Sequence, residues 1–110
     1  MSGCYLALDS SCYTTSVALW ARGGVLCAAR KPLEVPTGAR GLRQSEMVFQ
    51  HVRNYGTLFS EFPPEGRGVR AVAYSGRPCP TDGSYMPAFL VGKSFATAIA
   101  AALGVPAYAL

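Results

Sequence analysis

The sequence predicts one mixed α/β domain in which three antiparallel strands precede two helix–strand units. Short segments rich in Tyr, Leu, Val and Trp fill residues 4–29, which is typical of strands. Apolar residues then recur at helical spacing, and a short apolar segment follows each helical stretch. With 110 residues, half of them apolar, the chain can bury one core, so we expect a single domain over residues 1–110.

The first two strands are expected at Cys4 to Asp9 and at Thr15 to Arg22. The stretch "ARGGVL" then holds two adjacent glycines, which suit a tight hairpin turn, and a third strand is expected through Ala29. The Pro and Gly residues of "PLEVPTGARG" indicate a loop before the first helix.

The first helix is expected from Leu42 to Phe62. Its apolar residues recur at steps of four, three, four and three and predict one buried face, formed by Val48, Val52, Tyr55, Phe59 and Phe62. The opposite face carries charged residues: Arg43, Glu46, Arg53 and Glu61. The only histidine of the chain, His51, also lies in this helix, and we expect it to be partly exposed.

The second half of the chain predicts a strand, a helix and a final strand. "VRAVAYS" is nearly all apolar and is typical of a strand buried on both faces. The loop "GRPCPTDGS" leads to Pro87 in the first turn of a second helix, which ends at Gly104 before the strand "VPAYAL". The loop is also a candidate functional element, because loops that follow buried strands often border sites.

The predicted order is therefore strand, strand, strand, helix, strand, helix, strand. A Rossmann fold needs a helix directly after its first strand, with glycines at the turn, so dinucleotide binding is argued against. The order is that of a ribonuclease-H-like or actin-like (ASKHA) lobe.

Composition narrows the function only a little. Ten Lys and Arg against six Asp and Glu give a net charge of +4, spread along the chain, which permits contact with nucleic acid without specifying it. Asp9 interrupts the first apolar run, so no secretory signal is predicted, and we expect a cytoplasmic protein with no membrane span. The four cysteines are widely spaced and only one histidine accompanies them, so we expect no zinc site: Cys4, Cys12, Cys27 and Cys79.

The first hairpin carries an unusually long polar turn, "DSSCYTT", where two residues could have joined the strands. Small residues let backbone N–H groups converge on an anion, and Asp9 could hold an accompanying cation or a water. Ser, Thr and Asp are also ordinary turn residues, so a purely structural turn remains open at this point.

Several stretches together resemble the N-terminal lobe of the TsaD/YgjD family, formerly called O-sialoglycoprotein endopeptidases or glycoproteases, within the acetate kinase, sugar kinase, Hsp70 and actin superfamily. They are "LALDSSCYTTSVALW", "GLRQSEMVFQHV" and "VRAVAYSGRPCPTDGSYMPAFLVGKSFATAIAAALGVPAYAL". The resemblance implies that Asp9, Ser10, Ser11 and Cys12 lie in a cleft against the phosphates of a nucleotide. Tyr13 and Thr14 stand where the family usually shows two acids. The family's paired metal-binding histidines and its second lobe would follow Leu110, so we expect only one lobe here.

The resemblance also implies a function. Family members are associated with transfer of a threonylcarbamoyl group to the adenosine beside the anticodon of tRNA, using ATP and a divalent metal. We expect the full-length protein to do this, with tRNA as a possible partner, and the isolated lobe to be inactive and to bind neither cofactor tightly.

Two alternatives remain. The first is a non-catalytic TsaB-like module that forms a homodimer or binds a family partner through the helices at 42–62 and 86–103. A small-residue strip in the second helix, Gly92, Ala96 and Ala100, would let another helix approach, or else packs on the domain's own sheet. The second alternative is the historical assignment as a metalloendopeptidase, for which the chain supplies no pair of metal ligands.

Overall fold

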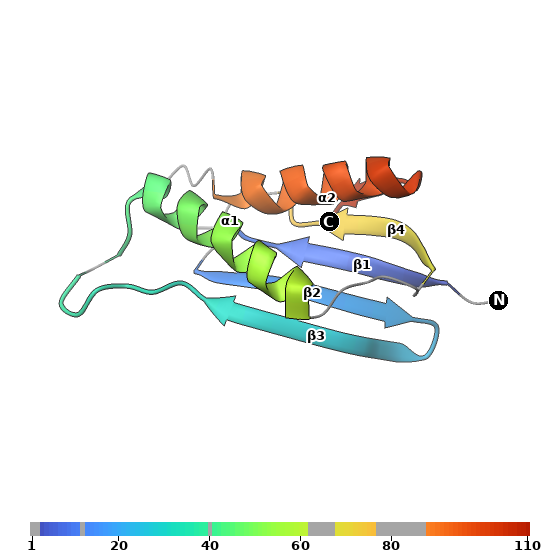
Figure 1. The fold of residues 1–110 in the computed structure, drawn as a ribbon, viewed down its shortest axis with the longest axis horizontal. Coiled ribbons are helices and arrows are strands. Elements are labelled where there is room, and N and C mark those ends of the chain that lie inside the picture. The colour runs from blue at the N-terminus through green and yellow to red at the C-terminus, as the bar shows by residue number, and fades with distance from the viewer. Residues whose placement is uncertain (1–2, 12, 40, 62–67, 77–87) are drawn as a thin grey trace.

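The computed structural model describes residues 3–11, 13–39, 41–61, 68–76 and 88–110. Seven elements follow one another along the chain: β1 (Cys4–Asp9), β2 (Thr14–Ala21), β3 (Gly24–Pro32), α1 (Gln44–Glu61), β4 (Val69–Tyr74), α2 (Phe89–Leu103) and β5 (Ala107–Ala109). The strands form one sheet in the order β3-β2-β1-β4-β5 (Figure 1). β1 pairs antiparallel with β2 and β2 with β3, whereas β4 runs parallel to β1 and to β5. The mixed α/β class predicted from the sequence is confirmed.

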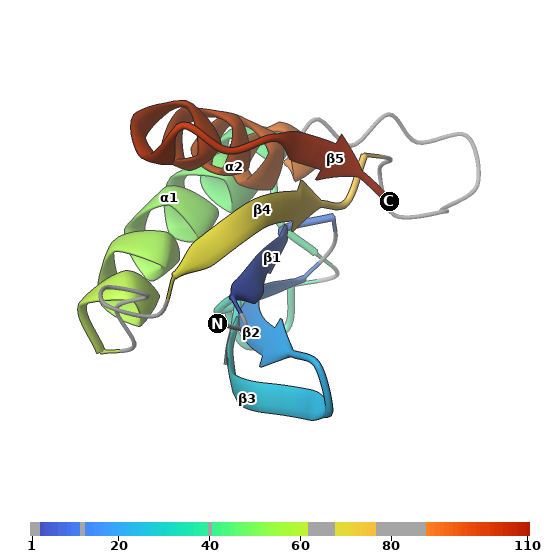
Figure 2. The same ribbon diagram turned by 90° about the vertical axis from the view of Figure 1, so that its right-hand side faces the viewer.

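Both helices lie on the same face of the sheet (Figure 2). Successive side chains of a strand point to opposite faces, and the alternating burial of β1 and β2 follows from this. The inward residues form one core with the two helices: Cys4, Leu6, Leu8, Val17, Leu19, Tyr55, Leu58, Val72, Val91, Ala96 and Ala100. Tyr5 and Trp20 pair on the opposite, open face, with ring centroids 5.9 Å apart.

Glycines with positive φ angles close two of the expected turns. Gly23 and Gly24, with φ angles of 109° and 142°, form the turn between β2 and β3. Gly104 ends α2 in the left-handed conformation, and its N–H is directed at the carbonyl oxygens of Ala100 and Ala101. Pro87 and most of the candidate loop before it lie outside the described residues.

The buried face of α1 differs from the predicted one. The structure buries Met47, Gln50, His51, Asn54, Tyr55 and Leu58. Val52, which was expected on that face, is 46% exposed, whereas His51 is 0% exposed and not partly exposed as predicted. The spacing of the apolar residues predicted the wrong face, because polar side chains of this helix are also buried. They can be buried because partners on the sheet, including the hydroxyl of Thr15, form hydrogen bonds with them. Phe62 lies outside the described residues.

The burial of β4 also differs from the prediction. β4 is buried only at Val72 and Ala73 and not along its length as predicted, because no helix covers the open face of the sheet within the described residues. Cys4 is buried and Cys27 is partly buried beside the core, whereas Cys12 and Cys79 lie outside the described residues. Within the described ranges, no helix is long and apolar enough to cross a membrane.

Candidate functional site

The turn between β1 and β2 is built around Asp9, the last residue of β1. Its carboxylate is exposed, and its Oδ1 atom accepts a hydrogen bond from the backbone N–H of Ser11 over 2.8 Å. This local bond folds the chain back immediately after the strand, as Asp side chains commonly do in turns. The second carboxylate oxygen has no described hydrogen-bond donor, so it is available to a ligand or to solvent.

Ser10 points the other way and holds the turn against α2. Its hydroxyl donates to the carbonyl oxygen of Ala88 and accepts from the N–H of Gly92, both over 2.8 Å. Its side chain is buried, with 1% exposure. This approach favours a glycine, because a Cβ at position 92 would lie 3.1 Å from the Ser10 Oγ atom and would crowd it. Ser10 therefore positions the turn rather than presenting its hydroxyl to the open face.

Polar side chains of α1 form hydrogen bonds with the start of β2 on the face of the sheet that the helices cover. The hydroxyl oxygen of Thr15 lies 2.7 Å from Nδ1 of His51 and accepts a hydrogen bond from Nδ2 of Asn54 over 3.1 Å. All three residues are buried. Buried polar groups that bond one another fix a single geometry, since breaking a bond leaves an unsatisfied group in the core. The turn is thus anchored to both helices.

Tyr55 reaches the same region from the middle of α1. Its hydroxyl donates to the carbonyl oxygen of Ser16 over 3.2 Å, and its ring lies in the core. Burial, reinforced by the negative charge of Asp9, raises the pKa of Tyr55 above its ordinary value. Tyr55 therefore stays protonated and acts as a hydrogen-bond donor beneath the turn.

Tyr13 occupies one of the two positions where acids were expected from the family pattern. Its ring packs in a second, smaller cluster that contains Leu33, Met47 and Ala88. Its carbonyl oxygen accepts from the N–H of Leu33 over 2.8 Å, and its hydroxyl accepts from the N–H of Leu42 over 3.4 Å. Tyr13 thus anchors the loop that leads from β3 to α1.

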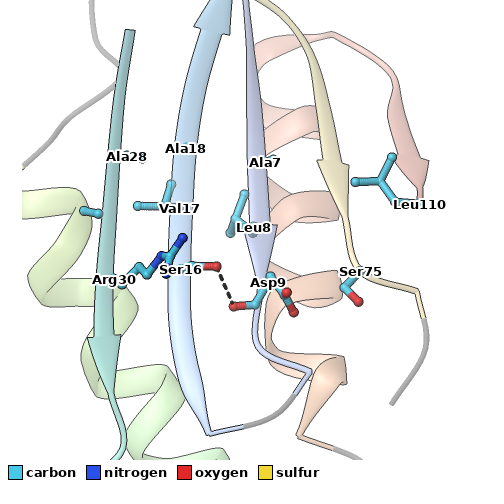
Figure 3. Close-up of a pocket in the computed structure, with 11 residues that line it drawn as sticks. Ala7, Leu8, Asp9, Ser16, Val17, Ala18, Ala28, Arg30, Ser75 and Leu110 are labelled. Atoms are coloured by element: carbon cyan, nitrogen blue, oxygen red, sulfur yellow. Dashed lines mark hydrogen bonds between the residues drawn. The ribbon is translucent and has the colours of Figure 1, made fainter. Parts of the chain in front are cut away.

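Two adjoining hollows open at this end of the sheet. The first, of about 400 Å³, lies on the open face over the alanines of the three neighbouring strands: Ala7, Ala18 and Ala28 (Figure 3). The second, of about 430 Å³, is lined on the turn side by Ser11, Tyr13 and Thr14. Both hollows share the same three polar residues: Asp9, Ser16 and Arg30. The combined site therefore has an apolar floor and a polar, charged end.

Arg30 is a site residue that the sequence analysis missed. Asp9 is paired with Ser16 across β1 and β2, and Ser16 is paired with Arg30 across β2 and β3, so the three form one row on the open face. The missed signal is the length of β3, which continues to Pro32 and not only to Ala29. A longer third strand would still not have placed Arg30 opposite Ser16, because the pairing of β2 with β3 shifts by one residue between Leu19 and Trp20 and the sequence does not reveal this shift.

Of the four predicted cofactor-binding residues, the structure brings Asp9 and Ser11 to the hollows and turns Ser10 toward α2. Cys12 lies outside the described residues. Within the described part of the chain, no group of three His, Cys, Asp or Glu side chains is placed to hold a metal ion. These residues therefore do not make a metal site by themselves, although the hydroxyls and Arg30 suit an anion.

The sheet order, with both helices on one face, defines a ribonuclease-H-like fold, and solved structures support this class. YeaZ from Pseudomonas aeruginosa superposes with a TM-score of 0.64 at 21% identity, over 98% of this chain and 43% of that chain. A T. thermophilus RuvC in complex with a Holliday junction substrate superposes with a TM-score of 0.55 at 15% identity, over 98% of this chain and 64% of that chain. At these identities the likeness shows the fold alone.

Sequence comparison gives the more particular relationship. The chain is 35% identical over 105 residues to a tRNA N6-adenosine threonylcarbamoyltransferase of Pyrobaculum calidifontis, and the match covers 92% of this chain. The predicted resemblance to the TsaD family is confirmed. The chain spans less than a third of that relative, since the match covers 29% of its length. No protein-family model matches the chain.

Proposed function

We propose that the chain is one actin-like lobe of a TsaD-type tRNA threonylcarbamoyltransferase, and that its β1–β2 turn contacts the phosphates of ATP. The observation that carries this proposal is the 35% identity that extends over nearly the whole chain. The position of the polar turn at an open hollow supports it further. The remaining nucleotide contacts and the tRNA site would come from a second lobe.

Each residue of the turn has a separate task in this proposal. Ser11 and Thr14 line the hollow, and their hydroxyls can donate to phosphate oxygens. Ser10 fixes the turn on α2, and Asp9 offers one carboxylate oxygen. A divalent metal bound with ATP would neutralise negative charge on the phosphates. Its other ligands do not come from the described residues, so no catalytic step is assigned to this lobe.

Ligand-observed ³¹P NMR with Mg-ATP tests this proposal. We expect the chain to broaden the phosphate resonances with a dissociation constant on the order of millimolar, since half a site gives few contacts. Asp9→Asn keeps the oxygen that Ser11 binds but removes the charge, and should weaken Mg-ATP binding. Glu61→Gln, at the exposed end of α1, is the matched control and should change nothing.

Three results would contradict the proposal. One is the absence of broadening at millimolar concentration, and another is equal broadening with Asp9→Asn and wild type. Micromolar affinity would also contradict it, because a complete site would then exist without a second lobe.

A second candidate function is a non-catalytic interaction module, comparable to TsaB-type proteins. The exposed apolar side chains of α1 favour it, since Phe49 is 56% exposed and Val52 is 46% exposed. The small-residue strip of α2 does not favour this function, because Gly92, Ala96 and Ala100 are all buried inside the domain. A homodimer or partner complex would therefore use the outer face of α1.

Sedimentation equilibrium distinguishes this second candidate. If α1 forms an interface between copies, wild type should associate at micromolar concentration, and Phe49→Ser should abolish association. Ser60→Ala, at an exposed position near the end of the same helix, is the control. A monomer at every concentration would exclude the homodimer. The described residues give the metalloendopeptidase alternative no support, because they hold no group of metal ligands. The cytoplasmic location stays a prediction.

A further inference from the structure

Arg30 lines both hollows, although nothing in the predicted turn motif involves it. It lies in the same row as Asp9 and Ser16, on the open face of the sheet. Figure 3 shows its side chain lying over β2 toward Ser16. The guanidinium is thus brought from β3 to the end of the sheet where the β1–β2 turn lies.

No described carboxylate neutralises this guanidinium. The ion pair found among the described residues joins Arg53 and Glu34, so Arg30 and Asp9 are not paired with each other there. Both side chains are exposed. A guanidinium carries a planar set of donors that matches two oxygens of a phosphate group at once.

Hydroxyl groups surround the position that such a phosphate would take. Ser11, Thr14 and Ser16 line the second hollow together with Arg30. The hydroxyls of Ser11 and Thr14 can donate to a phosphate oxygen, and that of Ser16 can do so by leaving the carbonyl oxygen of Asp9, to which it donates over 3.5 Å (Figure 3). Lys31, the next residue along β3, carries the same charge but lines neither hollow.

The position of Asp9 restricts the kind of ligand. It lies on the opposite side of Ser16 from Arg30 in the same row, so an anion held by Arg30 meets a negative charge there. The two like charges repel each other. A phosphorylated ligand that brings its own divalent cation avoids this repulsion.

We propose that Arg30 anchors a phosphate group of a magnesium-complexed polyphosphate ligand, against the hydroxyls of Ser11, Thr14 and Ser16. This inference rests on the proposed function and deepens it, because it adds a basic contact from β3 to a site otherwise made by the β1–β2 turn. The alanine floor beside Arg30 is left for the less polar part of the ligand.

Titration of the ¹⁵N-labelled chain with magnesium tripolyphosphate, followed by backbone amide shifts, tests the proposal without the rest of a nucleotide. Wild type should show shifts at Ser11, Thr14 and Ser16. Arg30→Gln should weaken the affinity about tenfold or more, as expected for loss of a charged hydrogen bond. Arg30→Lys should fall between the two, because it keeps the charge and loses the fork of donors.

Lys31→Gln is the matched control, since it makes the same change in net charge on the same strand. At about 0.1 M salt it should leave the affinity within about twofold of wild type. Arg30 is exposed and has no ion pair among the described residues, so Arg30→Gln should fold normally, which its thermal unfolding midpoint will verify.

The outcomes separate the inference from the proposed function. If tripolyphosphate shifts the turn but Arg30→Gln and Lys31→Gln bind equally, the assignment of Arg30 is wrong while the phosphate-binding turn stands. If tripolyphosphate does not shift the turn of wild type, the inference is overturned, and the Mg-ATP broadening decides the proposed function independently.

Discussion

At the scale of single residues, the turn depends on a close approach between Ser10 and Gly92. A Cβ at position 92 would lie 3.1 Å from the Ser10 Oγ atom and 3.3 Å from the Tyr55 hydroxyl oxygen. We therefore expect Gly92→Ala to lower the free energy of unfolding by about 1–3 kcal/mol, as overpacking does elsewhere. Gly56→Ala is the control: nothing lies within 4 Å of its Cβ, and it should stabilise α1 by roughly 0.5–1 kcal/mol. Equal stability of both variants in urea titrations would refute the close approach.

The buried hydroxyl of Thr15 gives a second prediction. Thr15→Val keeps the shape of the side chain but removes the oxygen that lies against His51 and Asn54. We expect a loss of about 1–3 kcal/mol, because polar groups are then left in the core without this partner. Thr97→Val removes a hydroxyl that bonds only the carbonyl of Lys93 on the exposed face of α2, and should cost less than about 0.5 kcal/mol. Chemical denaturation of the two variants measures the difference.

The raised pKa of Tyr55 makes stability depend on pH in the alkaline range. The unfolded chain releases this proton near the ordinary tyrosine pKa of about 10, whereas the folded chain retains it to higher pH. The contribution of Tyr55 is therefore present below about pH 10 and declines as pH rises above it, by up to about 1.4 kcal/mol per unit. Unfolding free energies of wild type and Tyr55→Phe, compared from about pH 8.5 to about pH 11, should converge. Parallel curves would show that the hydroxyl is not buried in this way.

Sequence reasoning could predict some of these residues and not others. The polar turn at Asp9 and Ser11 was predicted because turn chemistry is local and is visible in neighbouring residues, whereas the contact of these residues with a cofactor stays a prediction. The inward orientation of Ser10 was not predicted, because its partners Ala88 and Gly92 lie 78 and 82 residues away in sequence. His51 was misplaced for the same reason: its burial depends on Thr15, from a different element.

At the scale of elements, α2 is set on the sheet by its small residues. Gly92, Ala96 and Ala100 are buried in the domain and leave no room for larger side chains. Ala96→Leu should therefore lower the free energy of unfolding by about 1–3 kcal/mol. Ala98→Leu, on the exposed side of the same helix, should be nearly neutral. If Ala96→Leu instead altered only self-association and left stability unchanged, the strip would be an interface after all.

The elements themselves were well indicated by the sequence. β1 has the predicted bounds, and β4 ends one residue earlier than expected, because an apolar run bounded by turn residues is a strong signal. The face of α1 was harder, because its buried side carries Gln50, His51 and Asn54, which no hydrophobic periodicity can reveal. The end of β3 was placed too early, because Arg30, Lys31 and Pro32 do not look like strand residues.

At the scale of the whole molecule, both helices cover one face of the sheet and the site lies on the other (Figure 2, Figure 3). The helices therefore act as a support that fixes the turn through Ser10, Thr15 and Tyr55. The open face offers the alanine floor and the row of Asp9, Ser16 and Arg30 to whatever binds there. This division explains why the polar contacts are buried on one side and available on the other.

The measurement that tests this account most directly is a map of backbone amide shifts during titration with Mg-ATP. The account predicts shifts concentrated at Ser11, Thr14, Ser16 and Arg30, with the exposed residues of α1, such as Phe49, unchanged. Shifts confined to the helices, or an absence of shifts at millimolar Mg-ATP, would contradict the assignment of the β1–β2 turn as the phosphate-binding part of this lobe.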